Sequence, residues 1–570
     1  MYSGIFAEFP LNLPKVKSRG DKVAHTPFSK KEVVVAKGKL KKSAPGCDGL
    51  KREDIRNIPE DDLVALLNIV WGLKLIPSVW RQNRTVLIPK SDPPDGVNPG
   101  NWRPITISSL MYRLMHKIVA KRLESDLKLH SAQRRFTQTD GIMANLTILD
   151  TAIREHRGEG RSMFMVSVDL AKAFDRVSKE SILYRLAVEG VDKDTIEYIR
   201  SAYDGMTTTL ECNGQRSQPL SVKRGIRQGD PTSGALFNLV MDDVIRKFKS
   251  EDGVKVGDAR VCALAFADDL VVLSESEEGM RQHLAKLEDF LHEHGMEVNV
   301  GKCKALQIQR IPGTKRAAVR KEPMFKICGS TVATLSTESQ LGYLGHEFGH
   351  VGTLAPNPTR LESMLKSLQG AALKPQQKML MLNRYLIPRI MHHYQNPRVT
   401  AKHLEHVDRL VRTFVKATLH LPVTTPNAYL YAKMRDGGLS VPCMRHQVGV
   451  VYRRRLAKLR MQGDEQVKSV LNSETTRKLL KRLDVICGPV GPRRNDSKEY
   501  WRAQLEKCAL CGISKFQGKQ TSHWVENPPP YWSGEDYAKA IQLRIGLLPT
   551  RGAPYVSSES GRCRSNACEQ

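Results

Sequence analysis

In the stretch Phe266-Ala267-Asp268-Asp269, residues 267–269 lie between two short apolar runs, at residues 261–266 and 270–273. Two apolar runs that flank a short polar turn are typical of a β-hairpin. The turn of this hairpin would carry two adjacent carboxylates, Asp268 and Asp269. A carboxylate in a turn is ordinary by itself, because turns favour Asp. Whether these carboxylates have a function therefore depends on the residues that lie beside the turn in the fold.

A second acidic cluster adjoins another predicted strand. Residues 163–168 are nearly continuously apolar, which predicts a buried strand, and Asp169 follows them directly. If the two strands are neighbours, Asp169 and Asp268 converge, and like charges at close range require a cation. Oxygen ligands with room for water suit Mg²⁺. Two such ions would clamp the attacking and leaving oxygens of a phosphoryl transfer.

Helical patterns alternate with these predicted strands. Ser178 is a suitable N-cap for a helix that would end at Gly190. After the hairpin, apolar residues recur at helical spacing up to a glycine that would end the helix. Strand, helix, hairpin and helix in this order predict an α+β domain with an antiparallel sheet. The residues of the second helical pattern are Met280, Leu284, Leu287, Leu291 and Gly295.

The composition favours a nucleic-acid-binding protein. Among 570 residues, 89 are Lys or Arg and 60 are Asp or Glu, which gives a formal net charge of +29. Such a surplus favours an anionic partner, and Lys and Arg gain affinity for nucleic acid by releasing counterions from phosphates. An anionic membrane is the second candidate, but no amphipathic or lipidation signal supports it. The run Arg453-Arg454-Arg455 begins a basic C-terminal region, and the 11 cysteines are too scattered for a disulfide framework.

Further motifs surround the two acidic clusters in a definite order. These motifs are Leu87-Ile88-Pro89-Lys90, Asn101-Trp102-Arg103-Pro104-Ile105, Arg227-Gln228-Gly229-Asp230-Pro231, Gly295-Met296-Glu297-Val298-Asn299, Tyr343-Leu344-Gly345 and, upstream, Ala44-Pro45-Gly46-Cys47-Asp48-Gly49. The ordered set resembles the reverse transcriptases of non-LTR (type-1) retrotransposable elements. The upstream segment is similar to the family's finger segment, with Cys47 where Pro is more usual.

The resemblance extends to the C-terminal part of the chain. The stretch Leu419-His420-Leu421-Pro422-Val423-Thr424-Thr425-Pro426-Asn427-Ala428-Tyr429, followed by Gly437-Gly438-Leu439, is most similar to site-specific elements that insert into large-subunit ribosomal RNA genes. Full-length relatives begin with zinc-finger and DNA-binding segments and continue into an endonuclease domain. The resemblance therefore implies that this chain is a fragment of a larger polyprotein.

The resemblance implies a right-hand polymerase with fingers, a palm that contains an antiparallel sheet, and a helical thumb, followed by a basic nucleic-acid-binding region. We expect a basic N-terminal extension and finger segment at residues 1–69, and the reverse transcriptase fingers and palm at 70–349. The helical thumb would occupy residues 350–460. Residues 461–570 would form a basic nucleic-acid-binding and endonuclease-linker region that ends in a truncated zinc knuckle.

The resemblance also implies a role for each carboxylate. Asp169 and Asp268 would bind two Mg²⁺ ions, with Asp269 as a third catalytic carboxylate beside them. Arg103 would hold the incoming triphosphate, for which a guanidinium is suited, and Lys90 would add a positive charge nearby. For both Arg103 and Lys90, a solvated basic face is the alternative.

Other residues would contact the nucleotide or the primer. Gln228 would contact the nucleotide or the template at the start of a helix, and Gly229 would permit close backbone approach; a simple turn is the alternative. Lys302 would protonate the leaving pyrophosphate, unless it is a solvated surface lysine. The resemblance assigns the primer grip to Tyr343, Leu344 and Gly345.

Phe174 lies five residues after Asp169. In the family, this position is an aromatic plate under the deoxyribose, where it would clash with a 2′-hydroxyl. A Phe at this position could instead belong to the core. Within the motif we favour the sugar gate. Phe174 is then the residue that distinguishes a DNA polymerase from an RNA polymerase.

Cysteines near the C-terminus suggest an incomplete zinc site. Cys508 and Cys511 form a C-x₂-C pair with His523 beyond them, but a fourth ligand is not evident. Cys563 and Cys568 resemble the first half of the family's Cys-Cys-His-Cys knuckle, and the second half is missing. We therefore expect zinc only in the full-length protein.

We predict RNA-templated DNA synthesis from a nicked chromosomal 3′-hydroxyl. The partners would be element RNA, target DNA in a ribosomal RNA gene and deoxynucleoside triphosphates, with no membrane. The chain would act in the nucleus after synthesis in the cytoplasm. A mobile-intron reverse transcriptase is the nearest alternative, which the region around Asn427 and Gly437 disfavours. Intact Asp169, Asp268 and Asp269 disfavour an inactive remnant that only binds RNA.

Overall fold

The computed structural model describes residues 11, 13–90, 101–137, 139–487, 496–508 and 518–545. The chain forms two compact units that divide between Ser339 and Gln340. The first contains residues 1–339 and 464–466, and the second contains residues 340–463 and 467–570. Among the described helices, none has the length and apolar character that crossing a membrane requires.

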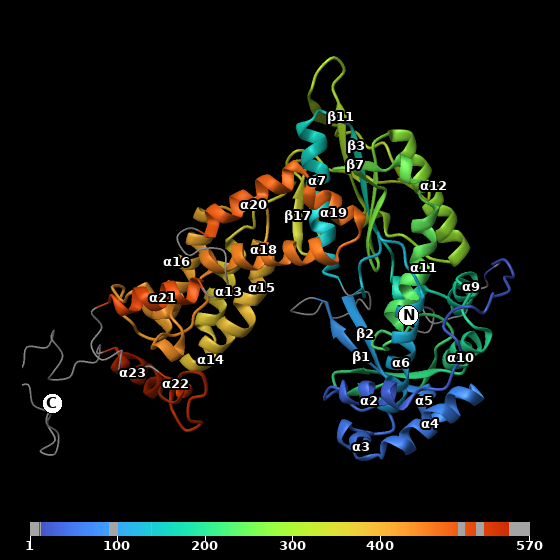
Figure 1. The fold of residues 1–570 in the computed structure, drawn as a ribbon, viewed down its shortest axis with the longest axis horizontal. Helices are drawn as coiled ribbons and strands as arrows, with labels where there is room; N and C mark the ends of the chain where they lie inside the picture. The colour runs from blue at the N-terminus through green and yellow to red at the C-terminus, as the bar shows by residue number, and fades with distance from the viewer. Residues whose placement is uncertain are drawn as a thin grey trace, which may run out of the picture. The chain divides into compact units, whose positions relative to one another are not determined.

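A six-stranded sheet lies at the centre of the first unit (Figure 1). β3 (Met163–Asp169) pairs antiparallel with β10 (Asp269–Ser274) on one side and with β11 (Lys304–Arg310) on the other. The predicted buried strand is therefore confirmed, and it is a direct neighbour of the predicted hairpin. The remaining strands of the sheet are β9 (Ala263–Phe266), β12 (Ala317–Val319) and β15 (Ala333–Thr334).

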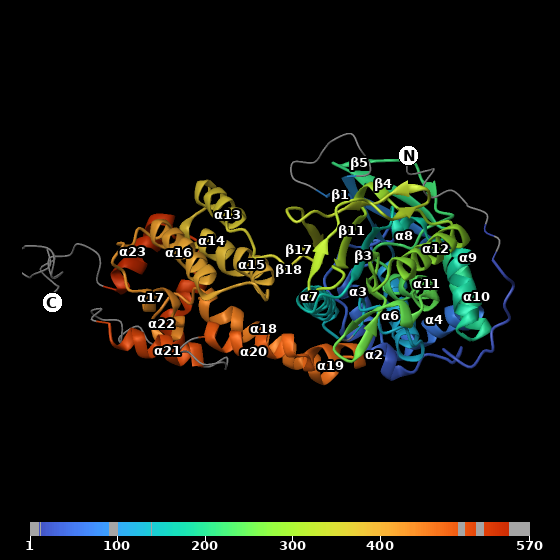
Figure 2. The same ribbon diagram turned by 90° about the horizontal axis from the view of Figure 1, so that it is seen from above.

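Apolar side chains cover both faces of this sheet. Successive residues of a strand point to opposite sides, and Met163, Phe164, Met165 and Val166 are all at most 4% exposed. α12 (Glu277–His294) packs on β3 and β10, and α7 (Gly141–Gly158) packs on β9. The two helices lie on opposite sides of the sheet (Figures 1 and 2). Burial on both faces explains why the strand reads as one continuous apolar run.

The predicted helices begin and end as their sequences indicate. α9 (Lys179–Val188) starts after Ser178, whose side chain accepts a hydrogen bond from the Ser181 backbone N–H at 2.9 Å. α12 ends at Gly295, which adopts a left-handed conformation with φ of 61°. A glycine takes this conformation without the steric penalty that a side chain would meet.

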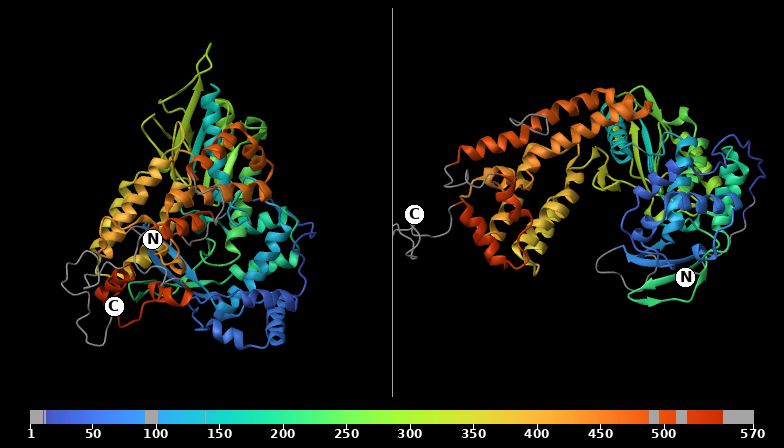
Figure 3. Two further views of the ribbon diagram at one scale, coloured as in Figure 1. Left: turned by 60° about the vertical axis from the view of Figure 1, so that its left-hand side comes forward. Right: turned by 60° about the horizontal axis from the view of Figure 1, so that its bottom comes forward.

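A second sheet of the first unit joins β1 (Gln82–Pro89) to β2 (Trp102–Ile107) and β4 (Thr207–Cys212). β1 runs antiparallel to β2 and parallel to β4, and the strands appear together in Figure 3. The shorter strands of the unit are β5 (Gln215–Arg216), β6 (Leu220–Ser221), β7 (Val254–Val256), β8 (Ala259–Val261), β13 (Lys326–Ile327) and β14 (Ser330–Thr331).

Helices enclose both sheets of the first unit. α11 (Ser233–Lys247) packs against α9 and α12 and carries apolar residues into the shared core. It corresponds to the helix that was predicted after the Arg227–Pro231 motif. The other helices are α2 (Lys30–Gly38), α3 (Arg52–Asn57), α4 (Glu60–Leu73), α5 (Ser78–Arg81), α6 (Leu110–Asp126), α8 (Ala173–Arg176), α10 (Lys193–Tyr203), η2 (Ser250–Asp252) and η3 (Val300–Lys302).

The second unit is mainly helical. Residues 359–418 contain four helices and a π-helical turn. These elements are α13 (Thr359–Gly370), α14 (Pro375–Met381), η4 (Leu382–Leu386), α15 (Ile387–Tyr394) and α16 (Ala401–Thr418). They are followed by α17 (Asn427–Tyr431), η5 (Met434–Asp436), α18 (Met444–Gln462), α19 (Glu465–Asn472), α20 (Glu474–Cys487), α21 (Asp496–Glu506), α22 (Lys519–Glu526) and α23 (Gly534–Arg544). A small sheet precedes them, with strands β16 (Leu341–Tyr343), β17 (His346–Gly349) and β18 (Gly352–Thr353).

A buried polar network stabilises the loop before α11. Asp230 is 7% exposed and accepts hydrogen bonds from His116 Nδ1 at 2.8 Å and from the Thr232 backbone N–H at 2.9 Å. Arg227, 5% exposed, lies 3.5 Å from Asp230 and donates to the Tyr112 hydroxyl. Burial alone would raise the pKa of Asp230, but His116 and Arg227 beside it keep that pKa well below its usual range. Arg227 and Asp230 therefore form part of the core.

Replacing Asp230 should destabilise the fold strongly. Asp230→Ala leaves the buried Arg227 without its counter-ion, and loss of one partner of a buried pair costs about 3–5 kcal/mol. The control is Asp204→Ala, which removes the partly exposed ion pair with Lys179 and should cost at most about 1 kcal/mol. Chemical denaturation would give both values. Equal losses of unfolding free energy for the two variants would contradict the structural role of the network.

Candidate active site

The hairpin of β9 and β10 places two carboxylates at its turn. Phe266 pairs with Asp269, and Ala267 between them adopts a positive φ of 57°. The side-chain oxygen of Gln133 accepts a hydrogen bond from the Ala267 backbone N–H at 3.0 Å. Asp268 and Asp269 are exposed, whereas the strand residues on either side are buried. The tight turn therefore leads both carboxylates out of an apolar sheet.

Asp169 ends the neighbouring strand directly beside this turn. In the antiparallel register of β3 and β10, Asp169 lies opposite Asp269. The backbone at Asp169 is held from the other side, because the Asn299 N–H donates to its carbonyl at 2.8 Å and its own N–H donates to Cys303 Sγ at 3.4 Å. The structure thus brings together the three carboxylates that the sequence indicated.

The charges of the three carboxylates repel one another. Partial burial on the sheet raises the pKa of Asp269 to about 6, and the negative charges of Asp268 and Asp169 raise it further. Burial likewise raises the pKa of Asp268. Both side chains reach solvent, but the sheet removes water from one side of each carboxylate. A divalent cation would relieve the repulsion between these carboxylates, so their oxygens are a suitable ligand set for it.

Arg135 is a charged neighbour that the sequence patterns did not single out. Its guanidinium lies 4.7 Å from the ring centroid of Phe266 and opposes the rise in pKa of Asp268 and Asp269. The backbone of this segment pairs with β9, with the Arg134 N–H donating to the Ala265 carbonyl at 3.0 Å. No motif in the sequence links these positions, since they are about 130 residues apart.

Phe174 lies at the edge of the core. In the sequence it follows Asp169 by five residues. Its ring stacks on Phe237 of α11, with centroids 4.2 Å apart and planes inclined by 14°. The side chain is half-buried, so Phe237 supports one face of the ring. A ring fixed in this way is compatible with both a sugar gate and a packing role.

Gln228 contacts a carboxylate that the sequence patterns also missed. Its side-chain nitrogen donates to Asp175 Oδ1 at 3.1 Å, and burial raises the pKa of Asp175 to about 6. The two residues line a small cavity of about 20 Å³ together with Pro104 and Thr106. Gly229 has a φ of 120°, and a Cβ there would lie 2.6 Å from the Thr106 carbonyl oxygen. This glycine therefore permits the close backbone approach that was expected.

The predicted basic residues of the site are exposed. Arg103 on β2 pairs with Ile88 of β1, and Lys90 follows the end of β1. The positive charge of Lys90 partly opposes the rise in the pKa of Asp175 that burial causes. Lys302 is also exposed, in the short helix η3 beside the segment that holds Asp169.

The motif Tyr343-Leu344-Gly345 lies in the second unit, where it forms the turn between β16 and β17. Tyr343 is 4% exposed, and Leu344 and Gly345 have positive φ angles of 46° and 82°. His392 contacts the Leu344 carbonyl at 2.9 Å, and His393 contacts the Gly345 carbonyl at 2.5 Å. Cys511, Cys563 and Cys568 lie outside the described residues.

Comparisons with known proteins agree with this geometry. Residues 88–348 match the family described as reverse transcriptase (RNA-dependent DNA polymerase). A Retrovirus-related Pol polyprotein from the type-1 retrotransposable element R2 of Popillia japonica is 33% identical over 551 residues, which are 96% of this chain and 76% of that protein. The Pol polyprotein of the type-2 element R2DM of Drosophila melanogaster is 33% identical over 89% of this chain and 48% of that protein. Apo telomerase from Candida tropicalis, truncated from its C-terminal domain, covers 43% of this chain and 54% of that chain, with 13% identity and a TM-score of 0.32.

The matched segment covers most of the α+β unit and identifies the chain as an RNA-directed DNA polymerase. The chain belongs to the family of R2 retrotransposable element Pol polyproteins. The predicted polymerase fold and the predicted reverse transcriptase activity are thereby confirmed. Proteins of this class use a divalent metal, an RNA template, DNA and nucleotides.

Proposed function

We propose that Asp169, Asp268 and Asp269 are the catalytic carboxylates, and that Asp169 and Asp268 hold two Mg²⁺ ions. The observation that carries this proposal is the register of β3 and β10, which sets Asp169 opposite Asp269. The raised pKa values of Asp268 and Asp269 are what a cation-binding set of oxygen donors has before the cation is bound. Magnesium, when bound, supplies charge neutralisation at the triphosphate and lowers the pKa of the primer 3′-hydroxyl.

The surrounding residues would position the nucleotide and the primer. Exposed Arg103 offers a guanidinium to the triphosphate, and Lys90 adds a positive charge near Asp175. Gln228 would contact the nucleotide or template, and Lys302 would donate a proton to the leaving pyrophosphate. Tyr343, Leu344 and Gly345 would form the primer grip, since His392 and His393 hold their turn through two backbone carbonyls.

We further propose that synthesis starts from a nicked chromosomal 3′-hydroxyl in a ribosomal RNA gene, and that the chain acts in the nucleus. The family membership supports target-primed synthesis. The nuclease that makes the nick would belong to a part of the family's polyprotein other than this polymerase segment.

The carboxylates can be tested one at a time. Asp169→Asn or Asp268→Asn removes a metal ligand but leaves the basic surface intact. Each should abolish extension of a primer on an RNA template with Mg²⁺, while the affinity for RNA changes little. Asp289→Asn, at an exposed position of α12, is the matched control and should remain active. An active Asp268→Asn protein would refute the assignment of the metal site.

The sugar gate predicts a change in substrate selection. Phe174→Val opens space for a 2′-hydroxyl without removing a charge. Incorporation of deoxynucleotides should survive, while the kcat/KM for ribonucleotides rises by about 10- to 100-fold, or about 1.4 kcal/mol for each tenfold step.

The alternative role of Phe174 gives a different result. If its stacking on Phe237 only stabilises the core, the substitution should cost on the order of 1–4 kcal/mol of stability. Both substrates would then be affected alike. The ratio of kcat/KM for the two nucleotides, measured together with the melting temperature, separates the two roles. An unchanged ratio with a lowered melting temperature would reject the gate.

The placement of the nuclease outside this segment is also testable. The purified chain should not nick supercoiled target DNA efficiently in Mg²⁺, while it extends a primer on an RNA template in the same buffer. The polymerase reaction serves as the control for folded protein. Efficient nicking that persists in the Asp169→Asn variant would place a nuclease centre within this chain.

A further inference from the structure

A pocket of about 480 Å³ lies within the second unit. α17, α18 and α21 supply most of its walls, and α17 packs directly on α21. Its volume is within the range of pockets that hold small organic groups. The described residues that line it are Tyr431, Lys433, Ser440, Val441, Pro442, Cys443, His446, Gln447, Val450, Val451, Arg454, Ser497, Lys498 and Trp501.

One wall of the pocket is aromatic. The Trp501 ring lies 5.1 Å from the His446 ring with planes inclined by 27°, and 4.8 Å from the Tyr431 ring. Arg412 donates to the Tyr431 hydroxyl at 3.0 Å, which fixes that ring. The result is a rigid aromatic surface built from three helices, and flat π-faces of this kind stack on nucleobases of any sequence.

Two buried nitrogens in this wall have no partner among the described residues. They are Nδ1 of His446 and Nε1 of Trp501. His446 is only 7% exposed, and burial lowers its pKa to about 4, so the ring is neutral at physiological pH. An unpartnered buried polar atom costs free energy.

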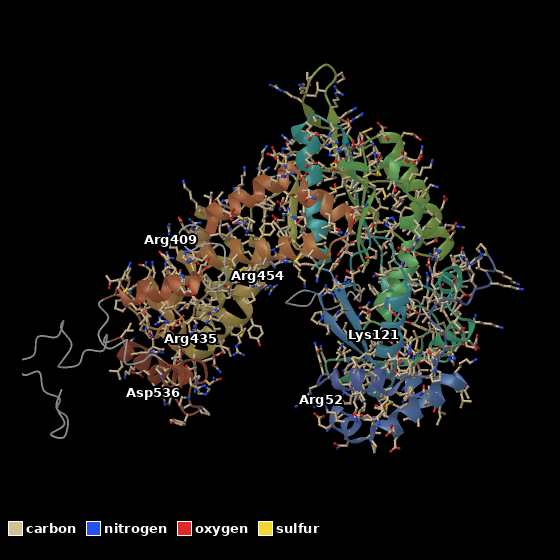
Figure 4. The ribbon with its side chains drawn as sticks, viewed as in Figure 1. Arg52, Lys121, Arg409, Arg435, Arg454 and Asp536 are labelled. Carbon is tan, nitrogen blue, oxygen red and sulfur yellow. The ribbon has the colours of Figure 1, made fainter. Side chains whose placement is uncertain are left out.

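The pocket is positively charged. Lys433, Arg454 and Lys498 line it, and its described lining contains no Asp or Glu. Within the run of three arginines, Arg453 pairs with Asp484 and Arg455 donates to Gln395 at 2.7 Å, while Arg454 is exposed (Figure 4). The neighbouring arginines therefore stabilise the fold, and Arg454 is the one positioned for an anionic ligand at the pocket.

We propose that this pocket binds an unpaired nucleotide of a single-stranded RNA, with the base against Trp501 and the flanking phosphates against Arg454 and Lys498. The proposal rests on the function proposed above only in taking element RNA as the source of the strand. A base offers both a π-face and hydrogen-bonding edges, and its phosphates match the three cations. Duplex nucleic acid does not fit, because its bases are stacked and paired.

The test measures binding of a short, fluorescein-labelled oligouridine to the whole chain preloaded with a primer–template duplex. Trp501→Ala should weaken this binding about tenfold, or about 1.4 kcal/mol. Arg454→Gln should weaken it by a factor of about three to ten. Arg409→Gln removes an exposed arginine of α16 that does not line the pocket, and it is the matched control for charge (Figure 4).

A second set of variants protects the test against misfolding. Ser497→Leu fills the pocket without changing the charge, and Trp501→Phe keeps an aromatic face. The first should weaken binding as Trp501→Ala does, and the second should largely restore it. Melting temperatures of all variants are compared with the wild-type chain. An unlabelled oligothymidine and an RNA duplex as competitors show whether the site accepts DNA or paired strands.

The outcomes separate this site from the polymerase site. If the inference is correct, the pocket variants lose single-strand binding while primer extension on a short template is retained, and Asp169→Asn does the reverse. The inference is overturned if Ser497→Leu and Trp501→Ala bind oligouridine as the wild type does. Equal losses of oligouridine affinity for Arg409→Gln and Arg454→Gln would overturn it too, since the affinity would then depend only on the net charge of the chain.

Discussion

Repulsion between neighbouring carboxylates is the constraint on which the first unit depends. The register of β3 and β10 sets Asp169 against Asp269, with Asp268 next in the turn, and the pKa of Asp269 rises to about 6. Without a cation this arrangement costs free energy, so the sheet beneath must resist relaxation. Strands that are buried on both faces provide that resistance, because a close-packed core cannot shift to separate the charges without opening voids elsewhere. The packing of the apolar strands thus keeps the mutually repelling carboxylates of the turn close together.

The same rigidity is reinforced by segments far away in the sequence. On one side, the N–H of Arg134 donates to Ala265, and Gln133 accepts from the N–H of Ala267. On the other side, the N–H of Asn299 donates to the carbonyl of Asp169. These bonds use backbone groups that would otherwise be unpaired at the ends of the strands. The position of each carboxylate is therefore fixed by backbone geometry, and the side chains remain available to a ligand.

Local patterns were sufficient to predict much of this arrangement. The apolar run before Asp169, the hairpin turn and the cap at Gly295 each depend on a few adjacent residues, and the structure has all three. The parts that the sequence did not reveal depend on contacts between distant segments. Arg135 reaches the turn only because its strand-like segment pairs with β9, and Asp175 is perturbed only because the chain buries it beside Gln228. Likewise, Trp501 and Tyr431 are 70 residues apart, and no periodicity connects them. The roles of individual site residues stay predictions, since geometry alone places them without assigning their chemistry.

The basic residues fall into two groups, those that stabilise the fold and those that can bind nucleic acid. A net charge of +29 indicates a polyanionic partner but does not say which cations face it. Arg227 and Arg134 are at most 5% exposed and pair with Asp230 and Asp464, so they stabilise the fold. Arg103 and Arg454 are exposed, and only such residues can exchange counterions with phosphates. The number of phosphates that the chain neutralises is therefore set by the exposed cations along the path of the nucleic acid, and it must be smaller than the count of basic residues suggests. Burial, more than composition, decides which arginines serve the fold and which can serve the RNA.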